Sequence, residues 1–415
     1  MTDAPRSRLL GLLSAACELE HALGCSYLYA AFSIKTDTSE HITWQEQQLY
    51  REWASRIYHV AAQEMLHLGQ AWNLITALGG SPYIRRPSFP QPAKWFQLPV
   101  ALSLRRFDER TLDRFVYYEN PVEPTPGTDA GGRVSEKDEW PDGEAFEFGS
   151  VGELYEECRR LIELLGDEAI INVEELQATR ATVHFPDIIP VTSVESAIAA
   201  IDRIVDQGEG TPHDREDSHF AVFRTLRAQF GEHVASIGAS TPARPVAENP
   251  YLKRRRNDAV VAQDIAGLSK GLRVTEISDP HSAHVADLFD DAYVAMLQAL
   301  AVLFCRPGGS PAMTVVSLQL MVTVIKPLGE CLSILPSGED GMNAGACFSM
   351  GRAPLLSPTP LVAELLLRER LAELASRGED LLNTHPVSKA AAADRLRSAV
   401  YNLRRLSQIL EDHRS

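Results

Sequence analysis

The spacing Glu-x-x-His occurs three times before residue 220, as Glu18–His21, Glu64–His67 and Glu216–His219. On a helix, residues i and i+3 lie on one face about a turn apart, so such a carboxylate and imidazole can point at one metal ion. A chain of this composition would contain roughly one such spacing by chance. Three within the first 220 residues predict a metal centre built on helices.

The pair Glu64–His67 lies in the apolar segment YHVAAQEMLHLGQAWNLI. Its flanks predict that both side chains face inward, where an unpartnered carboxylate is costly to bury. A metal ion would supply the missing partner. The alternatives for this pair are a surface ion pair or a hydrogen-bonded core histidine, and the apolar flanks favour the metal.

The first helix offers two carboxylates, Glu18 and Glu20, and helical periodicity does not decide which of them points inward. Glu20 has apolar neighbours at helical spacing. Glu18 and His21 occupy the faces of the helix adjacent to that of Glu20. Glu153 begins a later helix, where it is either a metal ligand or a first-turn acid favoured by the helix dipole.

Two carboxylates compete for the place beside His219. Glu216 has the i, i+3 spacing, and Glu209 lies in a Gly-Glu-Gly break whose flexible backbone can bring it back toward the bundle. Local spacing favours Glu216.

The elements that must position these side chains are helices. Apolar residues at helical spacing predict helices over about 7–34, 44–78, 151–165, 193–207 and from 218 onward. Residues 81–149 are rich in Pro, Gly and acidic residues and predict a long crossover with one short helix near 108–118. Crossovers of this kind connect the helices of some bundles and often cover a site.

The second half of the chain is also predicted to be helical, near 281–304, 312–334, 359–377 and 388–412. The predicted organisation is a bundle over 1–235, a linker over 236–280 that contains the basic run Lys253–Arg256, and a C-terminal helical domain over 281–415. Strand signals are weak and confined to about 170–190. The predicted fold class is therefore all-α, a four-helix bundle followed by a second helical region.

The formal net charge of −16 argues against binding to nucleic acid or to an anionic membrane surface. Six scattered cysteines without a CxxC pair are typical of reduced structural thiols, which predicts a cytoplasmic protein.

Several segments, in the same order, resemble the ferritin-like domain of the violacein-pathway iminophenylpyruvate dimer synthase and its stand-alone relatives. These segments are ELEHALGCSYLYAAFSIK (18–35), AAQEMLHLGQAWNLITALGGSP (61–82), VGELYEE (151–157) and QGEGTPHDREDSHFAVF (207–223). The resemblance spans about residues 8–230. Residues 285–350 also resemble the C-terminal region of that family.

The resemblance implies a ferritin-like bundle with a dimetal site. It implies that Glu20, and not Glu18, is the first-helix ligand, and it favours Glu209 over Glu216 against the spacing argument, so both stay candidates. The full set of predicted ligands is Glu20, Glu64, His67, Glu153, Glu209, Glu216 and His219.

Carboxylates with imidazole suit iron or else manganese. With the family resemblance, this site predicts an oxidoreductase that uses two metal ions and dioxygen on a small amino-acid-derived intermediate in specialised-metabolite biosynthesis. The alternatives are a non-redox small-molecule-binding or assembly protein, and iron storage or detoxification. A homo-oligomer is compatible with each of these functions. The substrate is not implied, because the pathway synthase is much longer than this chain.

Overall fold

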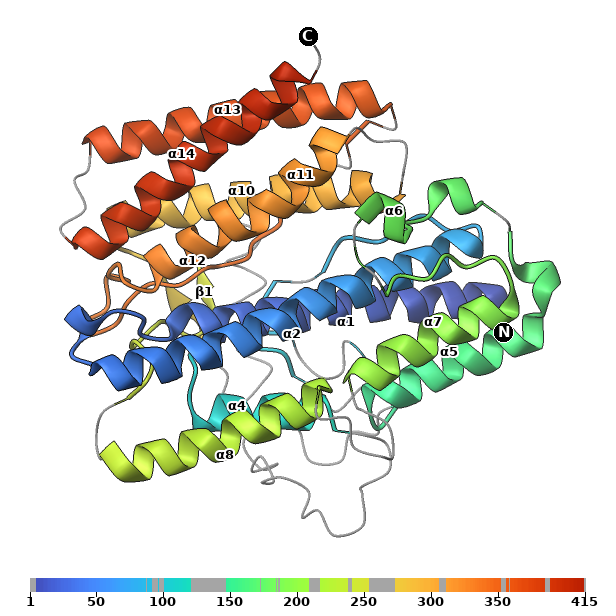
Figure 1. The fold of residues 1–415 in the computed structure, drawn as a ribbon, viewed down its shortest axis with the longest axis horizontal. Coiled ribbons are helices and arrows are strands. Elements are labelled where there is room, and N and C mark those ends of the chain that lie inside the picture. The colour runs from blue at the N-terminus through green and yellow to red at the C-terminus, as the bar shows by residue number, and fades with distance from the viewer. Residues whose placement is uncertain are drawn as a thin grey trace.

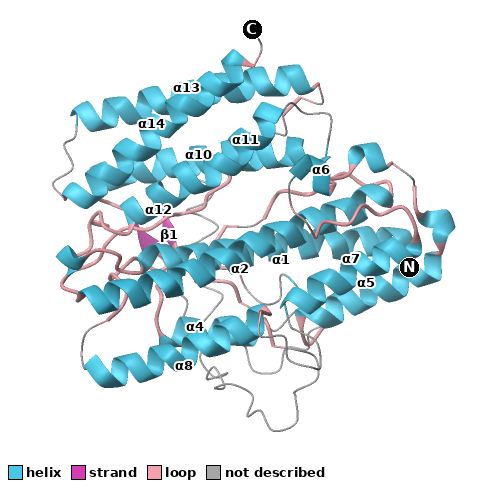
Figure 2. Cartoon of the chain, in the orientation of Figure 1, coloured by secondary structure: helices cyan, strands magenta, loops and turns pink. Residues whose placement is uncertain are grey.

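The structure is a computed structural model that describes residues 5–413, apart from 87, 92–95, 97–100, 121–146, 172, 184, 186, 209–216, 238–240, 254–272, 306–310, 352–355, 358 and 385–388. Helices dominate the described chain, as Figure 2 shows. The two short strands, β1 (Pro250–Tyr251) and β2 (Thr275–Glu276), pair in parallel.

Two long helices, α1 (Pro5–Ser33) and α2 (Trp44–Ala77), form the central layer of the molecule (Figure 1). A capping box between Thr43 and Glu46 fixes the start of α2. Four shorter helices lie below this layer in the view of Figure 1: α4 (Glu109–Tyr118), α5 (Val151–Leu165), α7 (Val194–Gly208) and α8 (His219–Ile237). Helix α4 packs on α8, and α5 packs on α7.

Among these helices, the described residues leave out 121–146, between α4 and α5, and 209–216, between α7 and α8. The ends of α4 and α7 meet on this lower side, because a methyl group built on Gly208 would lie 3.2 Å from Oε2 of Glu119. Helix α8 begins at His219 near the same point. Helix termini, and the polar groups that they carry, are thus brought into the interior of the bundle.

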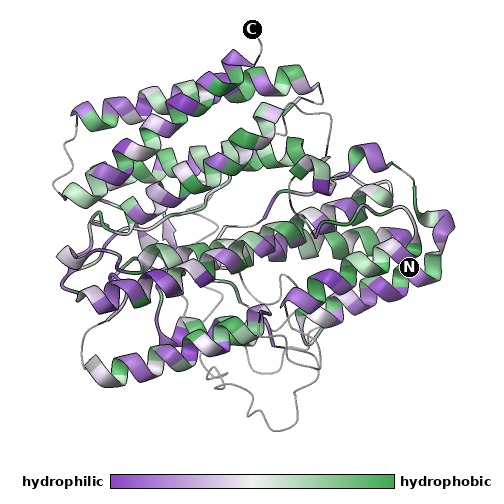
Figure 3. Cartoon of the chain, viewed as in Figure 1, coloured by the Kyte–Doolittle hydropathy of each residue, from purple (hydrophilic) through white to green (hydrophobic). Residues whose placement is uncertain are grey.

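The upper side of α1 and α2 is covered by the C-terminal helices (Figure 1). These are α10 (Pro280–Cys305), α11 (Pro311–Leu320), α12 (Lys326–Leu332), α13 (Pro360–Thr384) and α14 (Ala390–Asp412), and the short α6 (Arg180–Val183) also touches α10. Residues Met321–Ile325, labelled η4, form a π-helical turn between α11 and α12. Figure 3 shows that α10 and α11, the intermediate layer, are the most continuously hydrophobic.

Two glycines allow the C-terminal helices to approach the central layer closely. Gly69 of α2 lies against the ring of Phe304, and Gly329 of α12 lies against the ring of Phe32. A Cβ atom at either glycine would overlap the aromatic ring. The two halves of the chain therefore share one continuous apolar core.

The all-α prediction is confirmed, and the described helices begin and end close to their predicted limits. Among the described residues of 170–190 no strand occurs. The strands lie instead at 250–251 and 275–276, inside the predicted linker 236–280, and Arg244 in that segment donates its backbone N–H to the carbonyl of Ser33 at 2.8 Å. The domain limits 1–235, 236–280 and 281–415 stay a prediction.

The helical run Pro311–Leu332 has a mean hydropathy of 1.5 and is long enough to cross a membrane by length and composition. Half of this segment is buried inside the protein, as in a core helix, so the signal for a membrane span is weak.

Candidate metal centre

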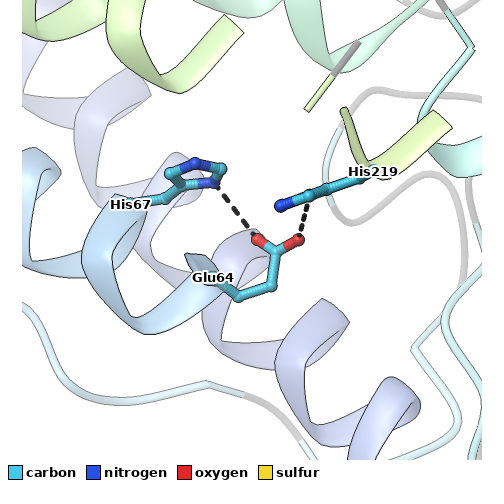
Figure 4. Close-up of side chains that lie close together, drawn as sticks. All are labelled: Glu64, His67 and His219. Atoms are coloured by element: carbon cyan, nitrogen blue, oxygen red, sulfur yellow. Dashed lines mark ion pairs between the residues drawn. The ribbon is translucent and has the colours of Figure 1, made fainter. Parts of the chain in front are cut away.

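The carboxylate of Glu64 lies between two histidines, as Figure 4 shows. Nδ1 of His67 is 3.4 Å from Glu64 Oε2, and Nδ1 of His219 is 3.0 Å from Glu64 Oε1. All three side chains are buried, and each offers one ligand atom within 4.8 Å of the others. This distance is short enough for shared coordination of a metal ion.

Two more carboxylates flank this group, one on each side. Glu20 Oε2 lies 3.6 Å from Nδ1 of His67, and Glu119 Oε1 lies 3.6 Å from Nδ1 of His219. Both carboxylates are buried. The cluster thus has two halves, Glu20 with His67 and Glu119 with His219, and Glu64 directs one oxygen toward each half.

Each outer carboxylate is held by a tyrosine hydroxyl. Tyr155 donates to Glu20 Oε1 at 2.5 Å, and Tyr27 donates to Glu119 Oε1. The tyrosines come from two different helices, α5 and α1. Burial raises the pKa of both hydroxyls well above the ordinary value, so both stay protonated donors. The two halves therefore match in their supporting hydrogen bonds as well as in their ligand atoms.

Gln207 orients the first histidine. Its Oε1 lies 3.1 Å from Nε2 of His67, at the end of α7. An amide oxygen can only accept, so Nε2 carries a proton, and Nδ1 is the ring nitrogen that faces Glu20 and Glu64. A hydrogen bond of this kind commonly fixes the tautomer of a metal-binding histidine.

The hydrogen bonding of the cluster is incomplete. Both oxygens of Glu64 and both ring nitrogens of His219 are buried without a hydrogen-bond partner. The 3.0 Å approach between these two residues brings their atoms close without the direction of a hydrogen bond. Unpaired buried polar groups are costly, and a cation between them would satisfy their lone pairs. The residues present therefore fit a metal ion.

The charges of the cluster also favour a cation. Burial alone would lower the pKa of His67, but Glu20 and Glu64 raise it to about 10. Burial likewise opposes protonation of His219, yet Glu64 and Glu119 raise its pKa to about 9. Burial raises the pKa of Glu20 to about 7, although His67 partly offsets the rise. The site thus attracts positive charge, which protons supply in the absence of a metal.

The structure brings together four of the predicted residues, Glu20, Glu64, His67 and His219. It does not bring Glu153 to them, contrary to the prediction. Glu153 lies exposed in the first turn of α5, where its carboxylate accepts the backbone N–H of Gly149 at 2.6 Å. Its position is that of the first-turn acid. Glu209 and Glu216 fall outside the described residues, so the choice between them stays open.

Sequence reasoning missed Glu119. It follows the last residue of α4 and belongs to no Glu-x-x-His spacing. The one available signal was its place directly after the short helix predicted near 108–118, at the end of an amphipathic segment whose buried residues include Phe115 and Tyr118.

A cavity of about 380 Å³ adjoins the cluster on the other side of α1 and α2. Glu20 and Glu64 border it from the central layer, and the C-terminal helices close it from above. Most of its lining is apolar, including Leu28, Met65, Met296, Leu297, Leu300 and Met321. Its volume is at the lower end of the range for small-molecule pockets, about 300–1,000 Å³.

Comparisons with known proteins agree with the resemblance seen in the sequence. A family model described as Ferritin-like matches residues 13–228. Dichlorochromopyrrolate synthase from Lentzea aerocolonigenes is 26% identical over 418 residues, which cover 89% of this chain and 38% of that protein. The 2-imino-3-(indol-3-yl)propanoate dimerase from Chromobacterium violaceum is 27% identical over 374 residues, 82% of this chain and 33% of that protein. The chain thus spans only about a third of these relatives' length.

A crystal structure of a ferritin-like protein from Caulobacter vibrioides aligns with 84% of this chain and 97% of its own, with 20% identity and a TM-score of 0.48.

Proposed function

Since this chain belongs to the ferritin-like family, we propose that it is a dimetal oxidoreductase acting on a small molecule derived from an aromatic amino acid. The observation that carries the proposal is the position of Glu64. Its two oxygens face two separate histidine–carboxylate pairs, and the cavity borders the same side chain. A carboxylate so placed would serve both halves of a site for two metal ions.

Glu20 and His67 would hold one ion, Glu119 and His219 the other, and Glu64 both. Iron, or else manganese, suits this oxygen- and imidazole-rich set. Bound in reduced form, the metals would supply electrons to dioxygen for oxidation of the substrate. Tyr155, Tyr27 and Gln207 would keep the ligands in place, and the apolar lining of the cavity would exclude water from the reacting groups.

The substrate class comes from the relatives and the cavity together. The name of one relative specifies an indolyl imino acid, and that of the other a chromopyrrolate. A cavity lined by Met, Leu and aromatic side chains suits a planar ring. We therefore place this chain in specialised-metabolite biosynthesis, with an amino-acid-derived aromatic compound as its substrate.

Elemental analysis tests the metal centre. After anaerobic reconstitution with iron(II), or with manganese(II) in a parallel sample, and desalting, we expect about two ions per chain, and His67→Ala and His219→Ala should each lower this occupancy. Protein that retains no iron or manganese after reconstitution would refute the proposal. Iron that accumulates well beyond two ions per chain would instead indicate storage.

Dioxygen consumption tests the redox activity. The iron-loaded protein, mixed with indole-3-pyruvate and ammonium as a source of the imino acid, should consume dioxygen as the indole compound disappears. His67→Ala should abolish this consumption. Full metal occupancy without any consumption of dioxygen would favour a non-redox binding protein.

A further inference from the structure

Helix α1 presents different side chains to the metal centre and to the cavity. Glu20 and Tyr27 face the metal cluster, whereas His21, Cys25 and Phe32 line the cavity at helical spacing. Between them lies Gly24, where a methyl group would contact Cβ of Glu64 at 3.4 Å. With no side chain at this position, the cavity reaches down to the carboxylates of the metal centre.

Three of the polar groups on the cavity wall form one cluster. The hydroxyl of Tyr293 on α10 contacts Nε2 of His21 and lies 3.0 Å from Sγ of Cys25. All three residues are buried and border the cavity. Two other rings hold the Tyr293 ring in place. Phe289 stacks on it with 6.2 Å between ring centroids, and Phe348 makes an edge contact with 5.1 Å between centroids.

A guanidinium adds positive charge to this cluster. Nη2 of Arg86 lies 3.6 Å from Sγ of Cys25 and donates to the carbonyl of Phe348 at 2.6 Å. The guanidinium carbon is 5.9 Å from the centre of the Tyr293 ring. Burial raises the pKa of the tyrosine hydroxyl and of the thiol, so both keep their protons.

The cluster is therefore rich in hydrogen-bond donors. A tyrosine hydroxyl, an imidazole and a thiol border the cavity and can each donate, and a carboxylate is a group that only accepts. The remainder of the cavity wall near Tyr293 is apolar, with Met296, Leu297 and Leu300 on the same helix. This wall suits the uncharged ring of a molecule whose acidic group lies at the cluster.

We propose that Tyr293, with His21 and Cys25, binds the carboxylate of the ligand in this cavity and so positions its aromatic ring beside Glu64. The ligand's identity as the substrate rests on the proposed function. The binding site itself does not depend on the metal. Tyr293 is thus a positioning and specificity residue, distinct from the metal ligands.

Two probes that differ in one group test this role in the full chain, measured under anaerobic conditions both with and without added iron. Indole-3-acetate carries a carboxymethyl group at C3 of the indole ring, and 3-methylindole carries a methyl group there, so the two probes differ only in the carboxylate. Calorimetry should show that the wild-type protein binds indole-3-acetate at least tenfold more tightly than 3-methylindole. Hydrogen bonds to the charged carboxylate contribute binding free energy that apolar contacts alone do not provide. In Tyr293→Phe this preference should fall to about twofold or less, with the affinity for 3-methylindole retained.

Tyr58→Phe is the matched control. Tyr58 also lines the cavity, but its hydroxyl donates to Glu330 at 3.0 Å, away from the cluster, so this variant should keep the preference for indole-3-acetate. If Tyr293→Phe does not fold, as judged by circular dichroism, His21→Leu replaces it and should lose the same preference. A purely structural role for Tyr293 would change the affinities for both probes alike.

An unchanged preference in Tyr293→Phe would overturn the inference, as would a wild-type protein that binds neither probe or does not discriminate between them. Neither probe requires oxidation for binding. Failure of metal loading or of dioxygen consumption would therefore refute the proposed function. It would not change the conclusion from the binding of the two probes.

Discussion

The two glutamates Glu119 and Glu153 allow the ligand set to be tested one carboxylate at a time. Glu119 lies 3.6 Å from His219, whereas Glu153 is exposed and bound to the backbone of Gly149. Glu119→Gln keeps the size of the side chain but removes its charge. We expect it to lower iron occupancy from about two ions per chain to about one, because an amide is a weaker ligand for a hard cation.

Glu153→Gln should leave iron occupancy unchanged, as measured by the same elemental analysis. The opposite result, with occupancy lost in Glu153→Gln and kept in Glu119→Gln, would restore the ligand that the family resemblance implied. It would also mean that α5 is placed differently around bound metal.

A candidate ligand can be predicted from the sequence when its own helix alone determines where it lies relative to the other ligands. Glu64 and His67 share one helix, so their spacing alone puts them on one face. Glu119 and Gln207 stand at the ends of two helices, and only the packing of α4 and α7 around α1 and α2 brings them to the histidines. No local sequence pattern indicates that these two helix ends lie beside the histidines, so the positions of Glu119 and Gln207 could not be predicted from the sequence.

Single glycines determine how closely helices approach one another. In Gly69→Ala the new methyl group would overlap the ring of Phe304, so α2 and α10 must separate. Overpacking of this kind lowers the free energy of unfolding by about 1–3 kcal/mol, so we expect a lower midpoint of thermal unfolding. Gly11→Ala is the control, because nothing lies within 4 Å of that position, and the better helix propensity of alanine should raise stability by up to about 1 kcal/mol. Equal effects of the two substitutions would contradict the close contact.

An ion cluster joins α12 to α2 and α14. Glu330 accepts hydrogen bonds from Lys326 at 2.7 Å, Tyr58 at 3.0 Å and Arg395 at 3.2 Å. Burial opposes ionisation of Glu330, but the two cations outweigh it and hold the pKa of this carboxyl below its ordinary value of 4.5. A carboxylate of this kind stabilises the fold above the pKa of the unfolded chain, and the stabilisation is lost as the pH falls through the folded value.

Glu330→Gln should therefore destabilise the protein at pH 7, by about 1–3 kcal/mol for the loss of charged hydrogen bonds. The difference from the wild type should shrink as the pH falls below about 4.5, which urea denaturation at several pH values can measure. A difference that stays constant down to pH 3 would show that the ionised form of Glu330 contributes nothing to stability.

The helices themselves were largely predictable, because apolar periodicity marks where each one lies. Their arrangement in layers was not. The contacts of Gly69 with Phe304 and of Gly329 with Phe32 join residues far apart in the sequence. The strand pair at 250–251 and 275–276 is too short to show a period of its own.

At the scale of the whole molecule, the candidate metal centre lies on one side of α1 and α2 and the cavity on the other. The family match ends at residue 228, yet α10 supplies the upper wall of the cavity through Tyr293 and Leu300. Activity should therefore require both halves of the chain. Leu300→Trp tests this requirement, because Leu300 is 2% exposed and an indole at this position would fill part of a cavity of about 380 Å³.

We expect Leu300→Trp to retain about two iron ions per chain but to lose binding of both indole probes and at least tenfold in dioxygen consumption with indole-3-pyruvate. Leu366→Trp is the control, because Leu366 on α13 is 42% exposed and does not line the cavity. Iron loss in Leu300→Trp would mean that the C-terminal helices support the ligands themselves. Unchanged oxidation would place the substrate on the lower side of the bundle, among α4, α5, α7 and α8, and would separate the cavity from the chemistry.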